Sequence, residues 1–570
     1  MKKIPPFFLS ALSGLLLFAA WPVSPSTFLI FVALVPLLWL EQRSTRAIKF
    51  FGWSYLALLI WNVATTWWVC NSTLPGGIAA IMANSLLMTL PWLGFHKMKK
   101  RLGPALGYSS LILFWLTFEY IHLNWELSWP WLTLGNVFAT HPEWVQWYEL
   151  TGVSGGSLWV LTVNLVVFLL LKEIFSPVTN RPLGEPVGIR RLNAKYLVIL
   201  ALLLIVPLAL SRLLTPANAV AANPISTIDR PGTTVSGSSA PSAGNPLVPA
   251  SRNDLPQPNI VVVQPNIDPY EKFAPGNEEA ELDRLIRLSE SQLDSRTALI
   301  VWPETAIPEP INEDAIRSNP FMARVWDLLR RHPGVQLLTG VEGYRVFSAE
   351  NKGSYSFRIP NSDNYEDSYN SAALLDSNGA QIYHKSKLVP GVETLPRFLK
   401  FMAPLFEKFG GTTGGYAQQE NRTVLLTSNN SYRVAPSICY ESIYGEFMSA
   451  YVRGGADLLV IITNDGWWGK TPGYRQHENY ARLRAIETRR WVARSANTGI
   501  SCFINPSGQV IDPQPWDKTT AIKYPVPRTD TMTFYVRHGD LLSHLAIALA
   551  LVLMLYWIFM IILKRKSANG

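Results

Sequence analysis

Long runs of apolar residues are the feature that most limits what this chain can fold into. A hydrocarbon layer about 30 Å thick needs roughly 20 predominantly apolar residues for each helix that crosses it. Seven such stretches lie in the first 215 residues and an eighth near the end, at residues 6–22, 27–40, 51–70, 78–95, 104–122, 157–171, 196–214 and 541–563. We therefore predict a membrane protein with about eight transmembrane helices, of which the second is the shortest.

The distribution of lysine and arginine predicts how the chain crosses the membrane, because these residues are retained in the cytoplasm when they lie near the ends of spans. They occur at the N-terminus, after the second, fourth and sixth stretches, and at the C-terminus, whereas the intervening loops, including residues 123–156, contain none. Both termini are therefore predicted to be cytoplasmic. The polar region between the seventh and eighth stretches lies on the opposite side, which is the periplasm if the membrane is a bacterial inner membrane.

The first stretch has a second interpretation. Lys2 and Lys3 precede an apolar run that ends in Phe18-Ala19-Ala20, which is the form of a cleaved signal peptide. Cleavage would leave seven spans, and the C-terminal cluster Lys564-Arg565-Lys566 would then be cytoplasmic only if the mature N-terminus were reversed. We expect the first span to be retained, because retention gives the simpler topology.

The charge of the chain follows from its topology. The 570 residues carry a net charge of +9, but only 16% of them are charged and 48% are hydrophobic, whereas a typical soluble protein has roughly 25% charged residues. The predicted cytoplasmic segments hold 17 Lys and Arg against three acids, and the rest of the chain has a net charge of −5. The basic balance is thus a topology signal, and we expect no nucleic-acid partner.

Cysteine and histidine are too sparse to form a framework. Cys70, Cys439 and Cys502 are widely spaced, and the 8 His show no ligand spacing, so neither a disulfide framework nor a metal site is expected. We expect no cofactor, and Cys70 and Cys502 are interpreted as structural.

Two features of the apolar half invite a functional interpretation. The loop at residues 123–156 contains the aromatic residues Trp125, Trp129, Trp131, Trp144, Trp147 and Tyr148, which are typical of a belt at headgroup depth. The alternative is that this loop frames an access site for lipids beneath the polar region. Glu119 is a single acid in the fifth stretch, and an acid in that position is either functional or interfacial.

The sequence divides into a membrane domain at residues 1–215, a linker at 216–258, a polar domain at 259–539, and a last helix with its tail at 540–570. Because the linker is dominated by Ala, Pro, Ser, Gly, Thr and Asn, it cannot bury a core, and we interpret it as a flexible tether. The polar domain alternates apolar runs with amphipathic segments, which predicts a layered α/β fold. Strands are predicted at 260–263, 298–301, 336–338, 371–375, 424–427, 434–438 and 458–463, and helices at 278–293, 321–331, 445–453 and 474–495.

Three short segments of the polar domain each place a reactive side chain after a predicted strand. They are Trp302-Pro303-Glu304-Thr305, the run from Tyr383 to Pro390 that contains Lys385, and Ser437-Ile438-Cys439-Tyr440-Glu441. Each alone has an ordinary interpretation, since a cysteine after a strand is most often a small core residue. In this order on an α/β background, they resemble the Glu-Lys-Cys set of the nitrilase superfamily.

The resemblance extends to one membrane-bound branch of that superfamily, the apolipoprotein N-acyltransferases. Its motifs are matched by Gln264-Pro265-Asn266, Asn464-Asp465-Gly466-Trp467-Trp468-Gly469, Arg482 through Arg494 with Ser495-Ala496-Asn497-Thr498-Gly499, Trp129-Pro130-Trp131 to Gly135-Asn136, and Glu149-Leu150-Thr151-Gly152-Val153 to Asn164. The match covers nearly the whole chain outside the tether. It implies eight spans, a nitrilase-like α/β domain with an αββα sandwich between spans seven and eight, and an acyltransferase activity.

The residue types suggest how the three side chains would act. A free thiol is only a few per cent ionised at neutral pH, so Cys439 needs activation to serve as a nucleophile. Glu304 as a base can take its proton, while Lys385 can stabilise the thiolate and donate to the tetrahedral oxyanion. The backbone N–H of Tyr440 is a candidate for a second oxyanion donor.

The resemblance adds two supporting carboxylates, Glu393 and Glu441. It also shows departures, because this chain has Lys387 where the family commonly has His, and Gly391-Val392 within the run that leads to Glu393. Lys385 occupies the family position of the catalytic lysine. Geometry alone leaves the two lysines undecided, since period-2 alternation in a strand would place Lys385 and Lys387 on the same face.

The resemblance implies a ping-pong reaction in which Cys439 takes an acyl chain from a membrane phospholipid, and the family's preferred phospholipid is phosphatidylethanolamine. The acyl chain then passes to the α-amine of a diacylglyceryl-modified N-terminal cysteine on an apolipoprotein. We expect the enzyme to be a monomer. The nearest alternative is a membrane-tethered amidase, in which water replaces the amine. A transporter or scaffold with an inactive α/β domain is the third alternative, but it would not need an intact triad.

Overall fold

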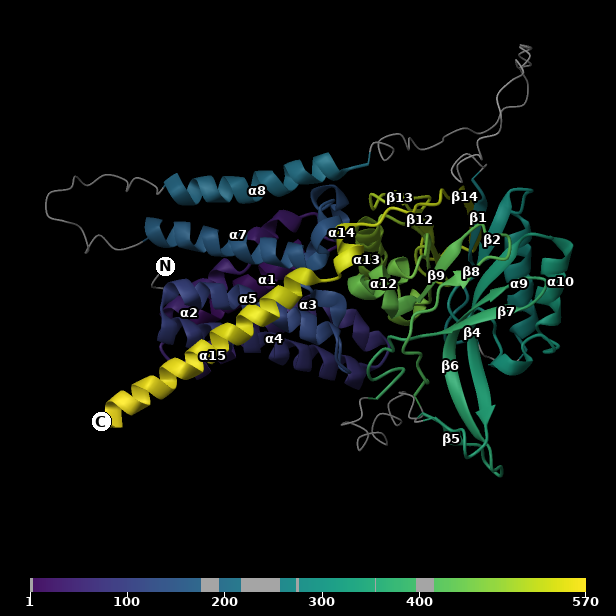
Figure 1. Ribbon diagram of the computed structural model, residues 1–570, viewed down its shortest axis with the longest axis horizontal. Coiled ribbons are helices and arrows are strands. Elements are labelled where there is room, and N and C mark those ends of the chain that lie inside the picture. Colours follow the sequence, from purple (N-terminus) through teal and green to yellow (C-terminus); the bar gives the residue numbers. More distant parts are fainter. Residues whose placement is uncertain are drawn as a thin grey trace, which may run out of the picture.

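The computed structural model describes residues 4–175, 194–216, 257–272, 276–353, 355–395 and 415–569. A helical half and an α/β half lie end to end (Figure 1). Helix α1 (Pro6–Ala20) begins, and helix α15 (Leu541–Asn569) ends, at the end of the helical half that is farthest from the α/β half. The predicted tether at residues 216–258 lies almost wholly outside the described residues.

All eight predicted apolar stretches contain helix. Besides α1 and α15, the long helices are α2 (Val35–Arg43), α3 (Ala47–Thr66), α4 (Leu74–Leu102), α5 (Pro104–Leu123), α7 (Val153–Ile174) and α8 (Ala194–Leu214). The shorter elements are α6 (Tyr148–Thr151) and the 3₁₀ turns η1 (Thr27–Phe31), η2 (Trp67–Asn71), η3 (Pro130–Leu132), η4 (Leu134–Thr140) and η5 (Pro142–Trp144).

The second stretch is not one continuous helix, which corrects the prediction. The backbone leaves the helix between η1 and α2, and the side chain of Asn164 on α7 satisfies the freed groups. Its Oδ1 accepts from the backbone N–H of Leu34 at 2.8 Å, and its Nδ2 donates to the carbonyl of Ile30 at 2.8 Å. Irregular backbone is tolerated at membrane depth only when protein covers it and pairs its polar groups, and Asn164 provides that pairing.

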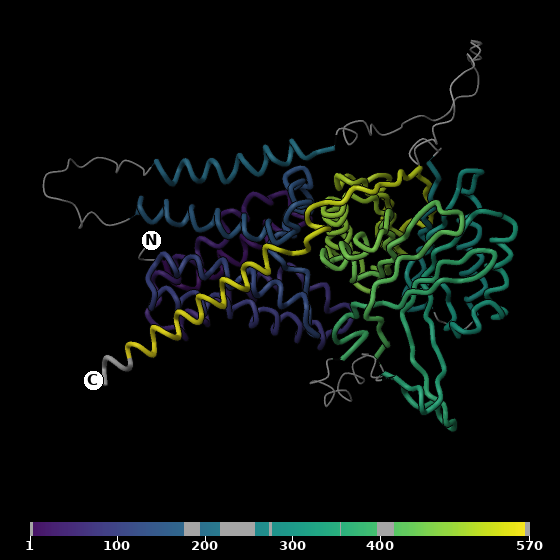
Figure 2. Tube along the Cα trace, in the orientation of Figure 1, coloured from purple at the N-terminus to yellow at the C-terminus, as the bar shows by residue number. Residues whose placement is uncertain are grey.

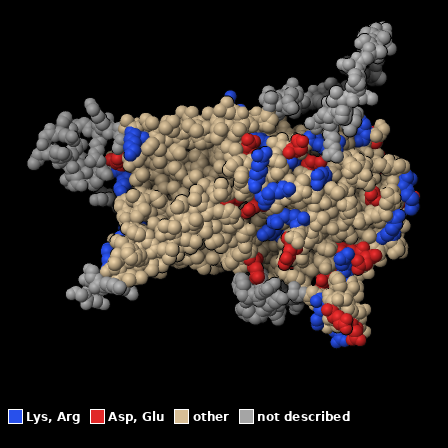
Figure 3. Space-filling view, viewed as in Figure 1, with Lys and Arg blue, Asp and Glu red and all other residues tan. Residues whose placement is uncertain are grey.

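Five segments of the described chain are long and apolar enough to cross a membrane. They are Ala47–Asn71, Leu74–Leu102, Val153–Ile174, Ala194–Leu214 and Leu541–Lys564. Helix α1 has 15 residues and is shorter than a typical span, and α5 carries the polar Glu119 and His122. The total of eight spans therefore stays a prediction. On the visible face, the helical half is almost free of charged residues, which gather at its far end and at the junction with the α/β half (Figure 3).

The α/β half contains two sheets. The first has the order β14-β1-β2-β4-β6-β5, with β3 paired to β4 and β7 to β6, and the second has the order β13-β12-β11-β10-β9-β8. The strands of the first sheet are β1 (Asn259–Gln264), β2 (Thr297–Val301), β3 (Ile311–Asn312), β4 (Gln336–Phe347), β5 (Phe357–Arg358), β6 (Tyr365–Leu375), β7 (Ala380–His384) and β14 (Thr520–Pro525). Those of the second are β8 (Leu425–Leu426), β9 (Arg433–Ile438), β10 (Leu458–Thr463), β11 (Trp491–Ala496), β12 (Cys502–Ile504) and β13 (Val510–Ile511).

The two sheets pack face to face between two layers of helices. Along β1, Ile260 and Val262 belong to the core shared with the second sheet, whereas Val261 and Val263 belong to the core under α9 (Glu278–Glu290) and α10 (Ala323–Arg331). Such alternation follows from the period of a strand. Helices α12 (Gly445–Arg453) and α13 (Pro472–Thr488) cover the second sheet on the side of the helical half, near the short α14 (Phe534–His538) (Figures 1 and 2). The result is an αββα sandwich.

The predicted helix at residues 474–495 is wrong in its last part. Helix α13 ends at Thr488, and Arg489 caps it with a left-handed backbone, φ +50°. The next residues form β11, which pairs in parallel with β10. The sequence Trp491-Val492-Ala493 is short and apolar, so its periodicity does not separate a buried strand from a buried helix.

The loop between α5 and α7 is mostly buried against the α/β half. Trp131, Trp147 and Tyr148 are each less than 10% exposed, so the interpretation as a headgroup belt does not hold for these three. Trp131 packs against Trp68 of η2 and Trp468 near the second sheet, with ring centroids 4.8 and 5.4 Å away. The loop is therefore part of the contact between the two halves.

Glu119 holds this loop from inside the helical half. It is 6% exposed, and its Oε1 accepts from the backbone N–H of Leu134 at 2.7 Å and from the indole of Trp115 at 2.8 Å. Through these contacts Glu119 fixes the position of η4.

The two halves are also joined by Arg489, whose side chain is 5% exposed. It donates to the carboxylate of Glu149 at 2.5 Å and to the side chain of Gln146 at 2.6 Å, as well as to backbone carbonyls that include Leu214.

We expect Arg489→Ala to destabilise the docking of the halves, because it leaves the partly buried Glu149 without its cation, a change that costs about 3–5 kcal/mol. The measurement is the thermal unfolding midpoint of the detergent-solubilised protein. Arg358→Ala, which removes an exposed pair with Asp363, is the matched control and is expected to leave the midpoint unchanged. An equal midpoint for both variants would contradict the prediction.

Candidate functional site

The three sequence segments with reactive side chains meet where strands of the two sheets end. Glu304 follows β2, Lys385 follows β7 and Cys439 follows β9. The three residues are 6%, 1% and 8% exposed. The structure thus brings together side chains that the sequence separates by up to 135 positions.

Glu304 is held in place on both carboxylate oxygens. Its Oε1 accepts from Lys385 Nζ at 3.1 Å and from Asn370 Nδ2 at 2.8 Å, and its Oε2 accepts from the backbone N–H of Asn464 at 3.1 Å. Gly340 of β4 allows the close packing behind it, because a Cβ there would lie 2.6 Å from the Cα of Glu304. The carboxylate therefore has a fixed orientation.

Lys385 forms a buried bridge between two carboxylates. Its Nζ lies 3.1 Å from Glu304 and 2.7 Å from Glu393. Burial by itself lowers the pKa of Lys385, but the charges of Glu304 and Glu393 outweigh it and raise this pKa well above its ordinary value. The lysine is therefore a permanent cation at neutral pH.

Glu393 and Asn370 complete this polar cluster. Glu393 accepts from the backbone N–H of Val389 at 2.8 Å with its second oxygen, and Asn370 Nδ2 donates to Glu393 at 3.1 Å as well as to Glu304. Sequence reasoning did not find Asn370, because it lies within β6 and reads as an ordinary strand residue.

Cys439 stands at a sharp turn between β9 and the 3₁₀ turn η11 (Cys439–Ile443), where its backbone is left-handed with φ +51°. Burial and the nearby Glu304 raise the pKa of its thiol well above the ordinary value, while Lys385 lowers it. Cys439 is therefore protonated at neutral pH and lies within the electrostatic reach of both a carboxylate and a cation. A thiol in this state needs a base in order to react.

The turn at Cys439 is supported from behind by His477, Asp465 and Arg494. His477 Nε2 lies 3.1 Å from the carbonyl of Cys439, its Nδ1 lies 2.9 Å from Asp465, and Arg494 lies 2.8 Å from the other oxygen of Asp465. The sequence motifs contain Asp465 and Arg494, but His477 was not identified, since a lone histidine on a helix carries no signal.

Glu441 has a structural position beneath the site. It is fully buried and accepts from the backbone N–H groups of Ile438 and Ser386 at 2.9 and 2.6 Å and from the hydroxyl of Tyr383 at 2.7 Å. Burial raises the pKa of Glu441 to about 7, against the effect of these donors. Glu441 thereby ties the segment that carries Lys385 to the turn that carries Cys439.

Tyr440 connects the site to the helical half, since its hydroxyl donates to the carbonyl of Ser128 at 2.7 Å. Tyr444 lies 2.7 Å from the hydroxyl of the same serine. The loop between α5 and α7 therefore contacts the residues that follow Cys439.

The remaining reactive residues lie elsewhere. Lys387 is not part of the ion-pair cluster that Lys385 forms with Glu304 and Glu393. Its ammonium lies 5.3 Å from the ring centre of Tyr444. Cys502 is buried within β12, and Cys70 lies in η2 of the helical half. In the described part of the chain, no group of three or more His, Cys, Asp or Glu side chains is placed to hold a metal ion.

We expect Asn370→Asp to slow the reaction of the Cys439 thiol with an acyl ester at pH 7 by about 100-fold or more, within the range of general-base contributions. A third carboxylate beside Glu304 and Glu393 favours protonation of the cluster, so the acid limb of the pH–rate profile moves to higher pH and part of the lost rate returns as the pH rises. The exposed Asn351→Asp is the matched control. A pH–rate profile identical to that of the parent would contradict the role of Asn370 as a neutral donor to Glu304 and Glu393.

Two family models match the chain. One is described as carbon-nitrogen hydrolase and matches residues 259–532, and the other is described as apolipoprotein N-acyltransferase N-terminal domain and matches residues 13–166.

Similar proteins match nearly the whole length of the chain. The apolipoprotein N-acyltransferase of Chlorobaculum tepidum is 33% identical over 563 residues, which are 96% of either chain. That of Geobacter metallireducens is 26% identical over 580 residues, covering 99% of this chain and 96% of the other. Among solved structures, an amidase from Nesterenkonia sp. AN1 is 17% identical, with a TM-score of 0.34, over 53% of this chain and 99% of that chain.

Proposed function

Because the chain belongs to the apolipoprotein N-acyltransferase family, we propose that Cys439 carries an acyl chain from a membrane phospholipid to the α-amine of an apolipoprotein. The chain is a membrane-bound acyltransferase with a nitrilase-like α/β domain. The observation that carries the assignment of residues is the buried contact of Glu304 with Lys385, next to the thiol of Cys439.

The first half of the reaction forms a thioester. Glu304 takes the proton of the Cys439 thiol as sulfur attacks the ester carbonyl of the phospholipid. Lys385 and the backbone N–H of Tyr440 donate to the oxyanion that develops. The C–O bond then breaks, the leaving alkoxide takes the proton from Glu304, and a lysophospholipid departs.

The second half returns the thiol. The α-amine of the diacylglyceryl-modified N-terminal cysteine attacks the thioester, Glu304 accepts a proton from the amine, and the C–S bond breaks. Glu304 then returns this proton to the thiolate of Cys439, and the product is an N-acylated lipoprotein. Glu393 orients Lys385 in both half-reactions. Glu441 holds the segment that carries Lys385 against the turn that carries Cys439.

The domains and the topology complete the proposal. Residues 1–215 and 540–570 form the membrane domain, residues 216–258 form a tether, and residues 259–539 form the catalytic domain. We place the enzyme in a bacterial inner membrane, with both termini in the cytoplasm and the catalytic domain in the periplasm. The positions of α1 and α15 support this arrangement, because α1 begins and α15 ends far from the α/β half. We propose that the enzyme acts as a monomer.

The test is to incubate the purified enzyme with a phospholipid and a diacylglyceryl peptide and to follow both by mass spectrometry. An acyl adduct on Cys439 that moves to the peptide amine is the expected result. Absence of the adduct would contradict transfer through a thioester, and an adduct cleared only by water would indicate an amidase.

A further inference from the structure

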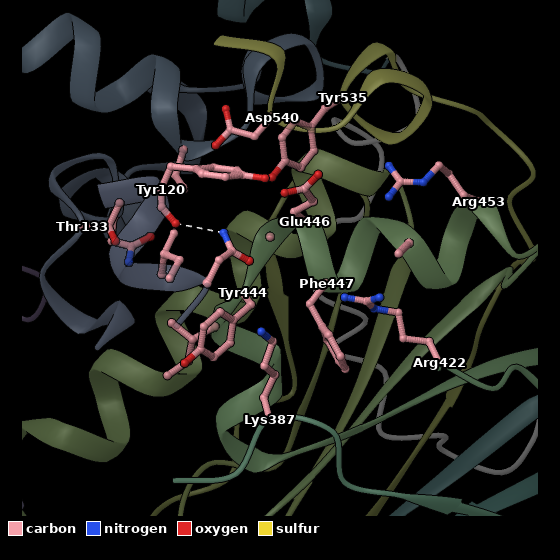
Figure 4. A pocket seen from close by; sticks show the side chains of 17 residues that line it. Tyr120, Thr133, Lys387, Arg422, Tyr444, Glu446, Phe447, Arg453, Tyr535 and Asp540 are labelled. Carbon is pink, nitrogen blue, oxygen red and sulfur yellow. Dashed lines mark hydrogen bonds between the residues drawn. The ribbon is translucent and has the colours of Figure 1, made fainter. Parts of the chain in front are cut away.

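A polar cavity of about 240 Å³ lies at the junction of the two halves, beside the catalytic residues but separate from them. The end of α5, helix α12, and the residues that lead from α14 to α15 enclose it, and none of Glu304, Lys385 and Cys439 lines it. Lys387, Arg422 and Arg453 line it, as do Glu446 and Asp540 (Figure 4).

Two of the cations point into this cavity and rest on aromatic rings. Lys387 Nζ lies 5.3 Å from the ring centre of Tyr444, and the guanidinium of Arg422 lies 4.4 Å from that of Phe447. Neither forms an ion pair with a carboxylate in the part of the chain that the structure describes. In contrast, Arg453 donates to the carbonyl of Val536 at 2.9 Å.

The charges around these two cations are mixed. Burial lowers the pKa of Lys387 and the charge of Arg422 lowers it further, whereas the charges of Glu441 and Glu446 raise it. Lysine and arginine side chains that converge without forming an ion pair to a carboxylate are typical of sites for phosphate groups. A phosphate would offset the repulsion and accept hydrogen bonds from both side chains.

The cavity also has the position that a lipid headgroup requires. Leu123 and Asn124, at the end of α5, lie on its wall, which places it at the boundary of the helical half. Lys387 follows Lys385 by two residues, a span of at most about 7 Å of chain, and Tyr444 packs on Tyr440 with ring centroids 5.3 Å apart. The cavity therefore lies beside the turn that carries Cys439, which is where the phosphate of an acyl donor has to bind.

We propose that Lys387 and Arg422 bind the phosphodiester of the phospholipid that donates the acyl chain. This inference rests on the proposed function and adds the subsite that recognises the donor. Lys387 stands where the sequence departs from its family, so the subsite gives that departure a role in donor binding.

The test uses the full-length enzyme in detergent micelles and two acyl donors, a phospholipid and a phosphate-free p-nitrophenyl ester. Acyl-enzyme formation is measured for Lys387→Gln, Arg422→Gln and the double variant. We expect the double variant to raise KM for the phospholipid by at least about tenfold, since charge-assisted hydrogen bonds are lost, with the burst of p-nitrophenol unchanged. Lys387→Arg keeps a donor cation and is expected to retain most of the affinity.

The chain offers matched controls in which a cation also rests on a ring. Lys352 lies 4.5 Å from the ring centre of Tyr365, and Arg317 lies 5.7 Å from that of Trp326. Neither lines the cavity, and Lys352→Gln and Arg317→Gln are expected to leave KM for the phospholipid unchanged.

An unchanged phospholipid KM in the double variant would overturn the subsite, as would a loss of the p-nitrophenol burst in parallel. If the variants only removed inhibition by inorganic phosphate, the site would bind free phosphate and the proposal would be wrong. Failure of the proposed function is distinct, because the parent enzyme itself would then form no thioester from the phospholipid.

Discussion

Replacing Cys439 by alanine is expected to abolish acyl transfer while leaving the protein folded. In the proposed mechanism the thiol forms the thioester, and removal of a nucleophile that works with a base costs about 10⁴-fold or more in rate. The side chain is small and the left-handed turn at φ +51° belongs to the backbone, so alanine takes its place without a large cavity. The measurement is mass spectrometry of the intact protein and of the acceptor peptide after incubation with phospholipid.

The other two cysteines provide matched controls for this prediction. Cys502 is buried in β12 and Cys70 lies in η2, and neither is near Glu304 or Lys385 in the arrangement described above. Cys502→Ala and Cys70→Ala are expected to retain transfer and the acyl adduct. Residual transfer by Cys439→Ala would mean that another group is the nucleophile.

Replacing Lys385 by methionine is expected to remove activity and to reduce stability together. Without the cation, the carboxylates of Glu304 and Glu393 face each other across Asn370, and leaving buried charges unpaired costs about 3–5 kcal/mol. One of the two carboxylates then takes up a proton, and the oxyanion loses its charged donor. Single-turnover acyl-enzyme formation and the thermal unfolding midpoint measure the two effects separately.

A second substitution separates charge balance from catalysis. Lys385→Met combined with Glu393→Gln removes one negative charge, so we expect it to regain part of the stability but none of the activity. Lys387→Met is the control for the choice of lysine, and it is expected to form the acyl-enzyme normally from a phosphate-free ester. If Lys385→Met remained active and Lys387→Met did not, the two lysines would have to exchange roles.

The sequence was sufficient for the parts of the site that follow strands. Glu304 and Cys439 each follow an apolar run, where the chain leaves a sheet, and the motifs of Glu304, Lys385 and Cys439 carry the family resemblance. Asn370 could not be found in this way, because its position depends on the pairing of β6 with β7, in which Ser371 lies opposite His384. That register is a property of two strands and is not visible in either one.

Long-range contacts also explain where the predicted elements differ from the fold. The break between η1 and α2 depends on Asn164, a residue 130 positions from Leu34, and the burial of Trp131 depends on Trp468. The local pattern of apolar residues predicts whether such a segment is helical and buried. It contains no information on the distant residue that breaks the helix or covers the side chain.

The contacts of Ser128 and Trp131 with the residues around the nucleophile mean that insertion into the bilayer is itself a step in building the catalytic centre. Tyr440 and Tyr444 fold against a surface that exists only after the first helices are in place, and that surface is synthesised more than 300 residues earlier. A secreted form of the α/β half would therefore leave the tyrosines beside its nucleophile uncovered. Chain order and membrane assembly together would then complete the surroundings of the proposed nucleophile in the membrane-inserted protein.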